Sequence, residues 1–306
     1  MLEQLSFFDL INDINVAEKI DNQDSSINEN WLLIDGNNLL NRCYYATAIN
    51  PDKLMTAPDG IPVNGVNGFL RTMLNQSKKL NARPVVFFDD GKGFRKELYP
   101  EYKNGRNETP EPLETQFPVI REILEKSSIA VYSSKTYEAD DLIASFVKIA
   151  KKHVYILSND KDLYQLINEN CTVIARKGKE DLYITPSQFK ELYDGLVPEQ
   201  IIDLKAIAGD SSDNIPGIRG ISEKGAIKLL LEFETLDKIL ETTEFPQNLN
   251  RYRNKIAEGK ENGIFARQLT KLVDNVELEV KDINMDTEIM RSYCRKLKLN
   301  RIMQML

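Results

Sequence analysis

The chain has 306 residues and a formal net charge of −7, with 42% hydrophobic and 28% charged residues. These values are ordinary for a globular protein with a sizeable core, and no apolar run approaches the length of a membrane span. The start of the chain lacks the basic-then-apolar pattern of a signal peptide, so a cytoplasmic protein without membrane contact is expected. The charge is uneven: residues 1–30 hold seven acidic residues and one lysine, which leaves the remainder close to neutral.

The counts of histidine and cysteine exclude several kinds of active site. His153 is the only histidine, which argues against serine–histidine–aspartate triads, cysteine–histidine pairs and multi-histidine metal sites. Cys43, Cys171 and Cys294 lie far apart and form no CxxC pair, so neither a disulfide framework nor a zinc site is indicated. We expect isolated buried thiols and a structural histidine.

In chain order, a polar acidic tail (residues 1–30) precedes a globular part that begins at Trp31. Apolar runs predict strands at 31–35, 84–89, 129–133 and 153–157, with a pair of short edge strands at 171–175 and 181–185. Helical patterns lie between them, at 36–49, 63–80, 113–126, 139–152 and 161–167. This alternation predicts an α/β fold with a mainly parallel central sheet flanked by helices.

Two regions depart from the alternation. Residues 91–111 form a polar, basic and aromatic insertion with little apolar periodicity, and long insertions of this kind are usually functional or disordered. After about Thr185 the pattern turns helical and ends in a basic helix over 288–306. We therefore predict three parts: the tail (1–30), an α/β core that includes the insertion (31–195), and a helical subdomain (196–306).

Acidic residues follow the predicted strands at the points where the strands end. The loops at the carboxyl ends of parallel strands share one crevice, so these side chains are expected to lie close together. One such aspartate would be only a turn former or helix cap, but several together call for divalent cations with oxygen ligands. The pattern predicts metal-dependent phosphate-ester chemistry. The predicted ligands are Asp35, Asp89, Glu138, Asp140, Asp141, Asp160, Asp162, Asp210 and Asp213.

The insertion interleaves basic residues with aromatic residues. Arg and Lys side chains hold phosphates and aromatic rings stack on unpaired bases, which favours single-stranded nucleic acid as a ligand. The alternative is a solvated, charged surface loop. Its place directly after Asp89 favours the functional interpretation.

Residues 213–230 (DNIPGIRGISEKGAIKLL) are typical of a helix, a hairpin and a second helix. Gly217 and Gly220 permit a tight turn, and Ser222 is a candidate N-cap for the helix that follows. Backbone N–H groups at such a turn bind phosphate without reading sequence, and Lys224 adds positive charge. The segment predicts contact with a duplex backbone.

Together these residues resemble the 5′ nuclease (flap endonuclease) family from about Trp31 to Phe265. The resemblance is carried by LLIDGNNLLNR, FFDDGKGFRKELYPEYKNGR, YEADDLIA, LSNDKDLYQL and LKAIAGDSSDNIPGIRGISEKGA. It implies Mg²⁺ or Mn²⁺, with two or more ions per active site. The implied tighter metal site consists of Asp35, Asp89, Glu138, Asp140 and Asp141, and the second site of Asp160, Asp162, Asp210 and Asp213.

The resemblance also implies roles for basic residues. Arg42 matches a residue near the scissile phosphate, and Arg95, Lys103 and Arg106 match an arch through which a single-stranded 5′ end passes, with Tyr102 beside them. The glycine hairpin matches a helix-hairpin-helix that grips duplex DNA and binds a monovalent cation such as K⁺. One departure is that the segment from Asp89 to Phe94 is one residue shorter than the common pattern, so Asp90 could share the role of Asp89.

The tail contains Gln4, Leu5, Phe7 and Phe8, a pattern that resembles the peptide with which bacterial proteins bind the replication sliding clamp. The alternative is that these apolar residues dock on the protein's own surface. A clamp-binding peptide on a flexible tether would raise the local concentration of the enzyme at loaded DNA.

The resulting expectation is a monomeric, metal-dependent, structure-specific 5′ nuclease of DNA replication and repair. It would act as a 5′-3′ exonuclease and flap endonuclease on branched DNA and RNA–DNA primer junctions, with a DNA polymerase acting in trans. Two alternatives are a catalytically silent branched-DNA-binding protein and a PIN-like ribonuclease. The complete acidic set argues against the first, and the glycine hairpin and the insertion argue against the second.

Overall fold

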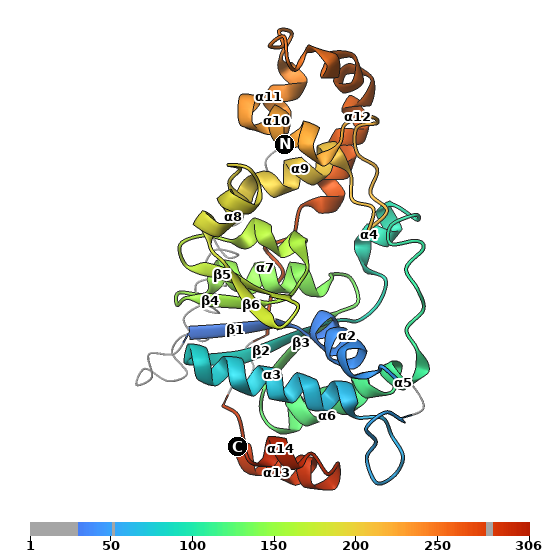
Figure 1. Ribbon diagram of the computed structural model, residues 1–306, viewed down its shortest axis with the longest axis vertical. Coiled ribbons are helices and arrows are strands. Elements are labelled where there is room, and N and C mark those ends of the chain that lie inside the picture. Colours follow the sequence, from blue (N-terminus) through green and yellow to red (C-terminus); the bar gives the residue numbers. More distant parts are fainter. Residues whose placement is uncertain (1–29, 51–52, 280–283) are drawn as a thin grey trace. The chain divides into compact units, whose positions relative to one another are not determined.

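The computed structural model describes residues 30–50, 53–279 and 284–306 (Figure 1). The predicted clamp-binding peptide, with the rest of the acidic tail, lies outside the described residues. The chain packs into two compact units. Unit 1 contains the described residues up to Gly91, together with Glu108–Asn159 and Asp274–Leu306, and unit 2 contains Lys92–Asn107 and Asp160–Val273. Among the helices of the described ranges, none is long and apolar enough to cross a bilayer.

The two units group the chain differently from the predicted domain ranges, which stay a prediction. The last part of the chain packs in unit 1, because backbone groups after Asp274 bond to side chains and backbone there. The Val276 N–H donates to Ser145 Oγ at 3.0 Å, and the Glu279 carbonyl accepts from the Tyr132 hydroxyl at 2.7 Å.

Unit 1 is built on four parallel strands. β1 (Asn30–Asp35) lies between β2 (Ala82–Asp89) and β4 (Val154–Leu157), and β3 (Ala130–Ser134) pairs with β2. The strands are mostly buried apolar runs, as expected for parallel strands covered on both faces. The register aligns Asp35 with Phe87 and Asp89 with Ser134, so β1, β2 and β3 end at the same edge.

Helices cover both faces of these strands. Figure 1 shows α7 on one side and α3 and α6 on the other. The apolar stripes of α2 and α3 face the core, where Leu39, Phe69 and Leu70 are fully buried. The helices of unit 1 are α2 (Gly36–Thr47), α3 (Asn64–Leu80), α5 (Glu111–Glu114), α6 (Gln116–Lys126), α7 (Ala139–Ile149), α13 (Thr287–Lys296) and α14 (Asn300–Met303).

The prediction of one basic helix over 288–306 is wrong in its extent. α13 ends before Leu297, and α14 begins at Asn300. Lys298 between them has a φ of 55°, in the left-handed region that a continuous helix does not allow.

Unit 2 contains the predicted pair of short strands, β5 (Cys171–Lys177) and β6 (Glu180–Ile184), which are antiparallel. Its remaining elements are helical, as the sequence predicts after Thr185. They are α4 (Gly93–Leu98), η2 (Lys161–Leu166), α8 (Pro186–Leu192), η3 (Pro198–Gln200), α9 (Ile201–Ala208), α10 (Glu223–Phe233), α11 (Leu236–Glu241), η4 (Asn250–Tyr252) and α12 (Arg253–Thr270), of which η2, η3 and η4 are 3₁₀-helices. α4 is a short helix within the insertion, where the sequence has little apolar periodicity.

The connection between α9 and α10 is a tight backbone crossing. Asp210 and Ile215 exchange two backbone hydrogen bonds, at 2.9 and 2.8 Å, and Ile218 N–H donates to the Ile207 carbonyl at 2.8 Å. A Cβ added at Gly217 would lie 2.2 Å from the backbone nitrogen of Gly209, so only glycine fits there. Ser222 accepts a hydrogen bond from the Gly225 N–H at 3.4 Å, which confirms its predicted place as the N-cap of α10.

We predict that Gly217→Ala lowers the free energy of unfolding by about 2–3 kcal/mol, because the new methyl group meets backbone atoms that cannot rotate away. Gly263→Ala is the matched control: its Cβ would meet the flexible end of Ile218 at 3.2 Å, and we expect a change below about 1 kcal/mol. Urea unfolding of both variants measures the difference. Equal stability of the two variants would contradict the close backbone approach at Gly217.

Candidate functional site

The predicted metal ligands are divided between the two units. The first carboxylate group, in unit 1, consists of Asp35, Asp89, Glu138, Asp140 and Asp141. The second carboxylate group, in unit 2, consists of Asp160, Asp162, Asp210 and Asp213.

Asp35 is the last residue of β1, and only 6% of its surface is exposed. Its Oδ1 accepts the Asn38 N–H at 2.9 Å and its Oδ2 accepts the hydroxyl of Ser158 at 2.8 Å. Ser158 follows β4 and is fully buried. The carboxylate is therefore held between the start of α2 and the end of the neighbouring strand.

Asp89, the last residue of β2, is tied to the start of α7. Its Oδ1 accepts the Ala139 N–H at 2.8 Å, and its own N–H donates to Asn37 Oδ1 at 3.1 Å. Glu138 and Asp140 flank Ala139 in the chain. Two neighbouring strands and one helix start thus bring most of the first carboxylate group to one edge of the parallel strands.

Asp141 is fully buried, and its Oδ2 accepts the Glu138 N–H at 3.1 Å across the first turn of α7. A carboxylate at this place satisfies a free backbone donor and interacts favourably with the positive end of the helix dipole. Asp140 and Glu138 are partly exposed, and so is Asp89, whereas the neighbouring Asp90 is exposed. The side chain that bonds to α7 is that of Asp89.

A cavity of about 510 Å³ lies beside Asp89. Arg121, on α6, forms part of its wall, donates to the Asp89 carbonyl at 3.0 Å and lies 4.6 Å from the centre of the Phe88 ring. Arg42, on α2, donates from Nη1 to Asn159 Oδ1 at 2.9 Å. The cavity is lined by Asn37, Asp89, Thr109, Glu114, Phe117, Pro118 and Arg121.

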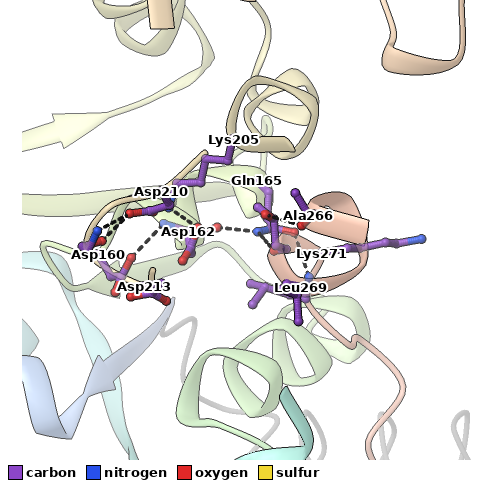
Figure 2. Close-up of polar contacts among 12 residues, drawn as sticks. Asp160, Asp162, Gln165, Lys205, Asp210, Asp213, Ala266, Leu269 and Lys271 are labelled. Atoms are coloured by element: carbon purple, nitrogen blue, oxygen red, sulfur yellow. Dashed lines mark hydrogen bonds and ion pairs between the residues drawn. The ribbon is translucent and has the colours of Figure 1, made fainter. Parts of the chain in front are cut away.

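In unit 2 a lysine lies between two acids of the second carboxylate group (Figure 2). Lys205 Nζ is 2.7 Å from Asp210 Oδ2 and also donates to Asp162 Oδ1. The three side chains are only 12–13% exposed. Asp160 joins them through its Oδ1, which accepts the Asp162 N–H at 2.9 Å.

Burial and charge act on these groups in opposite directions. Burial raises the pKa of Asp162 to about 7, although the ammonium of Lys205 opposes the shift. Burial also disfavours ionisation of Asp210, but Lys205 and hydrogen bonds from Ser212 outweigh it and lower the pKa of Asp210 to about 2. The two carboxylates keep Lys205 charged, because their attraction outweighs its burial and raises its pKa.

Asp213 is buried and bonds to the insertion. Its Oδ2 accepts the hydroxyl of Tyr102 at 3.0 Å, its Oδ1 accepts Arg106 Nη2 at 2.5 Å, and its carbonyl accepts the Lys103 N–H at 2.9 Å. Lys103 has a positive φ of 56°, and its Nζ lies 4.9 Å from the centre of the Tyr102 ring. The turn after α4 is thus fastened to the loop after α9.

Two residues predicted to contact nucleic acid are buried instead. Arg95 is 1% exposed and donates to the carbonyls of Leu269 at 2.8 Å and Lys271 at 3.0 Å, at the end of α12. Tyr102 is 3% exposed. In this conformation Arg95 supports the end of a helix, and the Tyr102 ring offers no surface on which a base could stack. The reason is that unpaired helix-end carbonyls and a buried carboxylate are strong hydrogen-bond acceptors.

The other predicted contacts are on the surface of unit 2. Gly220, with a φ of 80°, Ser222 and Lys224 are exposed, and Gly217 is partly exposed at the turn before them. Arg106 is also exposed, apart from the guanidinium nitrogen that bonds to Asp213.

The donor chemistry fits a hard divalent cation, since every predicted ligand is a carboxylate. The cysteines are buried, and burial raises the pKa of Cys171 to about 12, which disfavours a thiolate ligand. As the described residues are arranged, no three acidic, histidine or cysteine side chains already form a metal-binding cluster. Asp35, Asp89, Asp162, Asp210 and Asp213 each bond to a group of the protein.

Sequence reasoning missed the partners of the acids. Lys205 could have been found, because it is the only basic residue of the largely apolar α9. Ser158, Asn37 and Arg121 carry no signal of this kind, since single polar residues at strand ends and on helices are common.

Two family models match the chain in sequence. Residues 30–194 match the 5′-3′ exonuclease N-terminal, resolvase-like domain, and residues 196–291 match the 5′-3′ exonuclease C-terminal SAM fold. The chain therefore belongs to the 5′-3′ exonuclease family, which confirms the resemblance found in the sequence.

Similar curated proteins are bacterial DNA polymerases. DNA polymerase I of Bacillus subtilis is 41% identical over 258 residues, which cover 81% of this chain and 28% of the polymerase. The thermostable DNA polymerase I of Thermus thermophilus is 35% identical over 282 residues, which cover 89% of this chain and 32% of the polymerase. The chain thus spans about a third or less of the length of these relatives.

Similar solved structures include the 5′-exonuclease of bacteriophage T5 with bound zinc ions, at a TM-score of 0.66 and 23% identity over 90% of this chain and 97% of that one. The catalytic core of Rad2 in complex with DNA substrate has a TM-score of 0.58 and 15% identity. The match covers 92% of this chain and 94% of the Rad2 core. At these identities the likeness concerns the fold, and it confirms the predicted α/β class.

We predict that Arg95→Met lowers the free energy of unfolding by about 2–4 kcal/mol, because one buried and one partly buried carbonyl at the end of α12 lose a charged donor. Arg95→Lys should recover part of the loss, since an ammonium cannot reach both carbonyls with the same geometry. Lys92→Met, at an exposed position before α4, is the control and should change stability by less than about 0.5 kcal/mol. A small effect of Arg95→Met in urea unfolding would contradict the structural role.

Proposed function

We propose that this protein is a divalent-metal-dependent, structure-specific 5′ nuclease that acts in the cytoplasm as a monomer. It hydrolyses DNA phosphodiesters near a 5′ end or a flap junction, and removes RNA primers at RNA–DNA junctions. The observation that carries the proposal is the arrangement in unit 1, where Asp35 and Asp89 end neighbouring parallel strands and Asp89 bonds to the helix start that carries Glu138 and Asp140. Such an edge is where α/β proteins place their ligand sites.

The first carboxylate group would hold one Mg²⁺ or Mn²⁺ and the second carboxylate group another. When bound, such an ion supplies a water molecule of lowered pKa and positive charge for the leaving oxygen. The protein's own part is to hold the ligands: Ser158 and Asn38 fix the Asp35 carboxylate, and Ala139 fixes that of Asp89. Because Mg²⁺ keeps several waters, two or three such carboxylates are enough for each ion.

Basic side chains would bind and orient the substrate. Arg42, Lys103 and Arg106 are suited to contact phosphates, with Arg95 and Tyr102 supporting the arch from beneath. The exposed turn from Gly217 to Gly220, with Ser222 and Lys224, would bind the backbone of duplex DNA through N–H groups and charge, with K⁺ at the hairpin. These contacts recognise the shape and charge of the DNA backbone and do not depend on the base sequence.

The similar proteins support this proposal. The T5 protein is described as a flap endonuclease in a pseudo-enzyme–product complex with DNA and metal ions, and the Rad2 core as bound to DNA substrate. The relatives among DNA polymerases support a role beside DNA synthesis.

The decisive test is cleavage of 5′-labelled flap DNA and a matching single strand with Mg²⁺, Mn²⁺ or EDTA. We expect metal-dependent cleavage at the junction, and a loss of at least about a hundredfold in rate for Asp140→Asn, because the first carboxylate group loses a charge. Glu125→Gln, an exposed acid on α6, is the control and should retain the wild-type rate.

Tight flap binding without cleavage in either metal would replace this proposal by the catalytically silent branched-DNA-binding protein. A strong preference for RNA without a flap would favour the PIN-like ribonuclease. Normal turnover by Asp140→Asn would remove that residue from the metal site.

The tail adds a second interaction to the proposal: residues 4–8 bind the replication sliding clamp. A peptide of residues 1–12 should bind the clamp of a bacterial replication system in calorimetry, with the apolar side chains as anchors. The same peptide with Leu5, Phe7 and Phe8 replaced by alanine should not bind. Absence of heat with the natural peptide would contradict clamp binding and leave the nuclease proposal untouched.

A further inference from the structure

Lys205 has an unusual position for a lysine. It lies on α9 between Leu204 and Ala206, which are buried, and only 12% of its side chain is exposed. A buried ammonium is costly unless it is paired and hydrogen-bonded. Its two pairing partners, Asp162 and Asp210, come from separate segments of unit 2: one lies in η2 and the other in the loop after α9.

The positive charges around this lysine offset about half of the negative charge of the second carboxylate group. Asp160 Oδ1 accepts the Asp162 N–H, and Asp213 is paired with Arg106. When all four carboxylates of the second group are ionised, the two basic side chains leave a residual charge of about two negative units. Without Lys205 the residual charge would be one unit larger, in a place with little water to screen it.

The contacts of Lys205 use the carboxylate oxygens that a cation would need. Asp162 Oδ1 and Asp210 Oδ2 both bond to its ammonium, and the Oδ1 of Asp210 accepts from Ser212. Figure 2 shows the lysine side chain extending from its helix toward these two acids. Asp162 and Asp210 thus have a cation between them that the chain itself supplies.

We propose that Lys205 is a built-in counter-ion of the second carboxylate group, and that a divalent metal ion binds to Asp162 and Asp210 in exchange for its ammonium. The inference rests on the proposed function of this group as a metal site. Two consequences follow from it. The metal-free protein stays folded because the acids are neutralised internally, and the affinity of this site for a divalent ion is lower than the acids alone would give.

The test compares Lys205→Met with the wild-type chain, both in an Asp140→Asn background that weakens metal binding to the first carboxylate group. Calorimetric titration with Mn²⁺ gives the affinity, and thermal unfolding in EDTA and in Mn²⁺ gives the stability of each state. We expect Lys205→Met to bind Mn²⁺ on the order of tenfold more tightly, because a competing positive charge has been removed. We also expect a lower Tm in EDTA and a larger rise in Tm on adding Mn²⁺.

Two control variants separate this role from a general effect of charge. Lys238→Met removes one positive charge from an exposed ion pair with Glu234 in the same unit, and should keep the wild-type Mn²⁺ affinity. Lys205→Arg keeps the charge beside the acids and should also bind Mn²⁺ no more tightly than the wild type. A purely structural lysine would lower the Tm on replacement without tightening metal binding.

The outcomes are distinct from those of the nuclease test. A folded Lys205→Met that binds Mn²⁺ no more tightly overturns the inference, whereas flap cleavage by the wild-type chain would still support the proposed function. If Lys205→Met does not fold in EDTA, recovery of the folded state on adding Mn²⁺, in this variant or in Lys205→Gln, supports the exchange, and no recovery overturns it. Failure of every variant and of the wild type to bind Mn²⁺ overturns both.

Discussion

Carboxylates that are close together and shielded from water repel one another, and the rest of this structure depends on how that repulsion is contained. In the first carboxylate group, backbone N–H groups of Asn38 and Ala139 and the hydroxyl of Ser158 donate to aspartates at strand ends. In the second carboxylate group, Lys205 and Arg106 form ion pairs with the acids.

The same constraint explains the local architecture of the insertion. A buried Asp213 needs donors, and Tyr102 and Arg106 supply them from the turn after α4. The carbonyls at the end of α12 need donors as well, and Arg95 supplies them. Basic and aromatic residues that look in the sequence like a surface for nucleic acid are thus partly used to hold the segment in place. Those that remain exposed, with Lys103 partly so, are the ones available for a phosphate backbone.

A charged pair in a protein interior contributes little to net stability, since desolvation offsets most of the attraction. Its larger effect is on which segments of the chain pack together. Lys205 fits this view, because it brings two segments of unit 2 together through their acids and lowers the pKa of Asp210.

The sequence by itself determined the α/β class, the order of strands and helices, the family, and the edge at which Asp35, Asp89 and Glu138 gather. The first three follow from hydrophobic periodicity and sequence motifs, which are local in the sequence. The last follows from the geometry of parallel strands, which is general to this class of fold. It also placed Ser222 at a helix start, because capping depends on neighbouring residues alone. Only the tertiary structure decided that Arg95 and Tyr102 are buried, that Lys298 interrupts the final helix, and that Lys205 pairs with Asp162 and Asp210. These depend on hydrogen-bond acceptors and charges from distant parts of the chain, and a sequence pattern contains no record of which of them will meet.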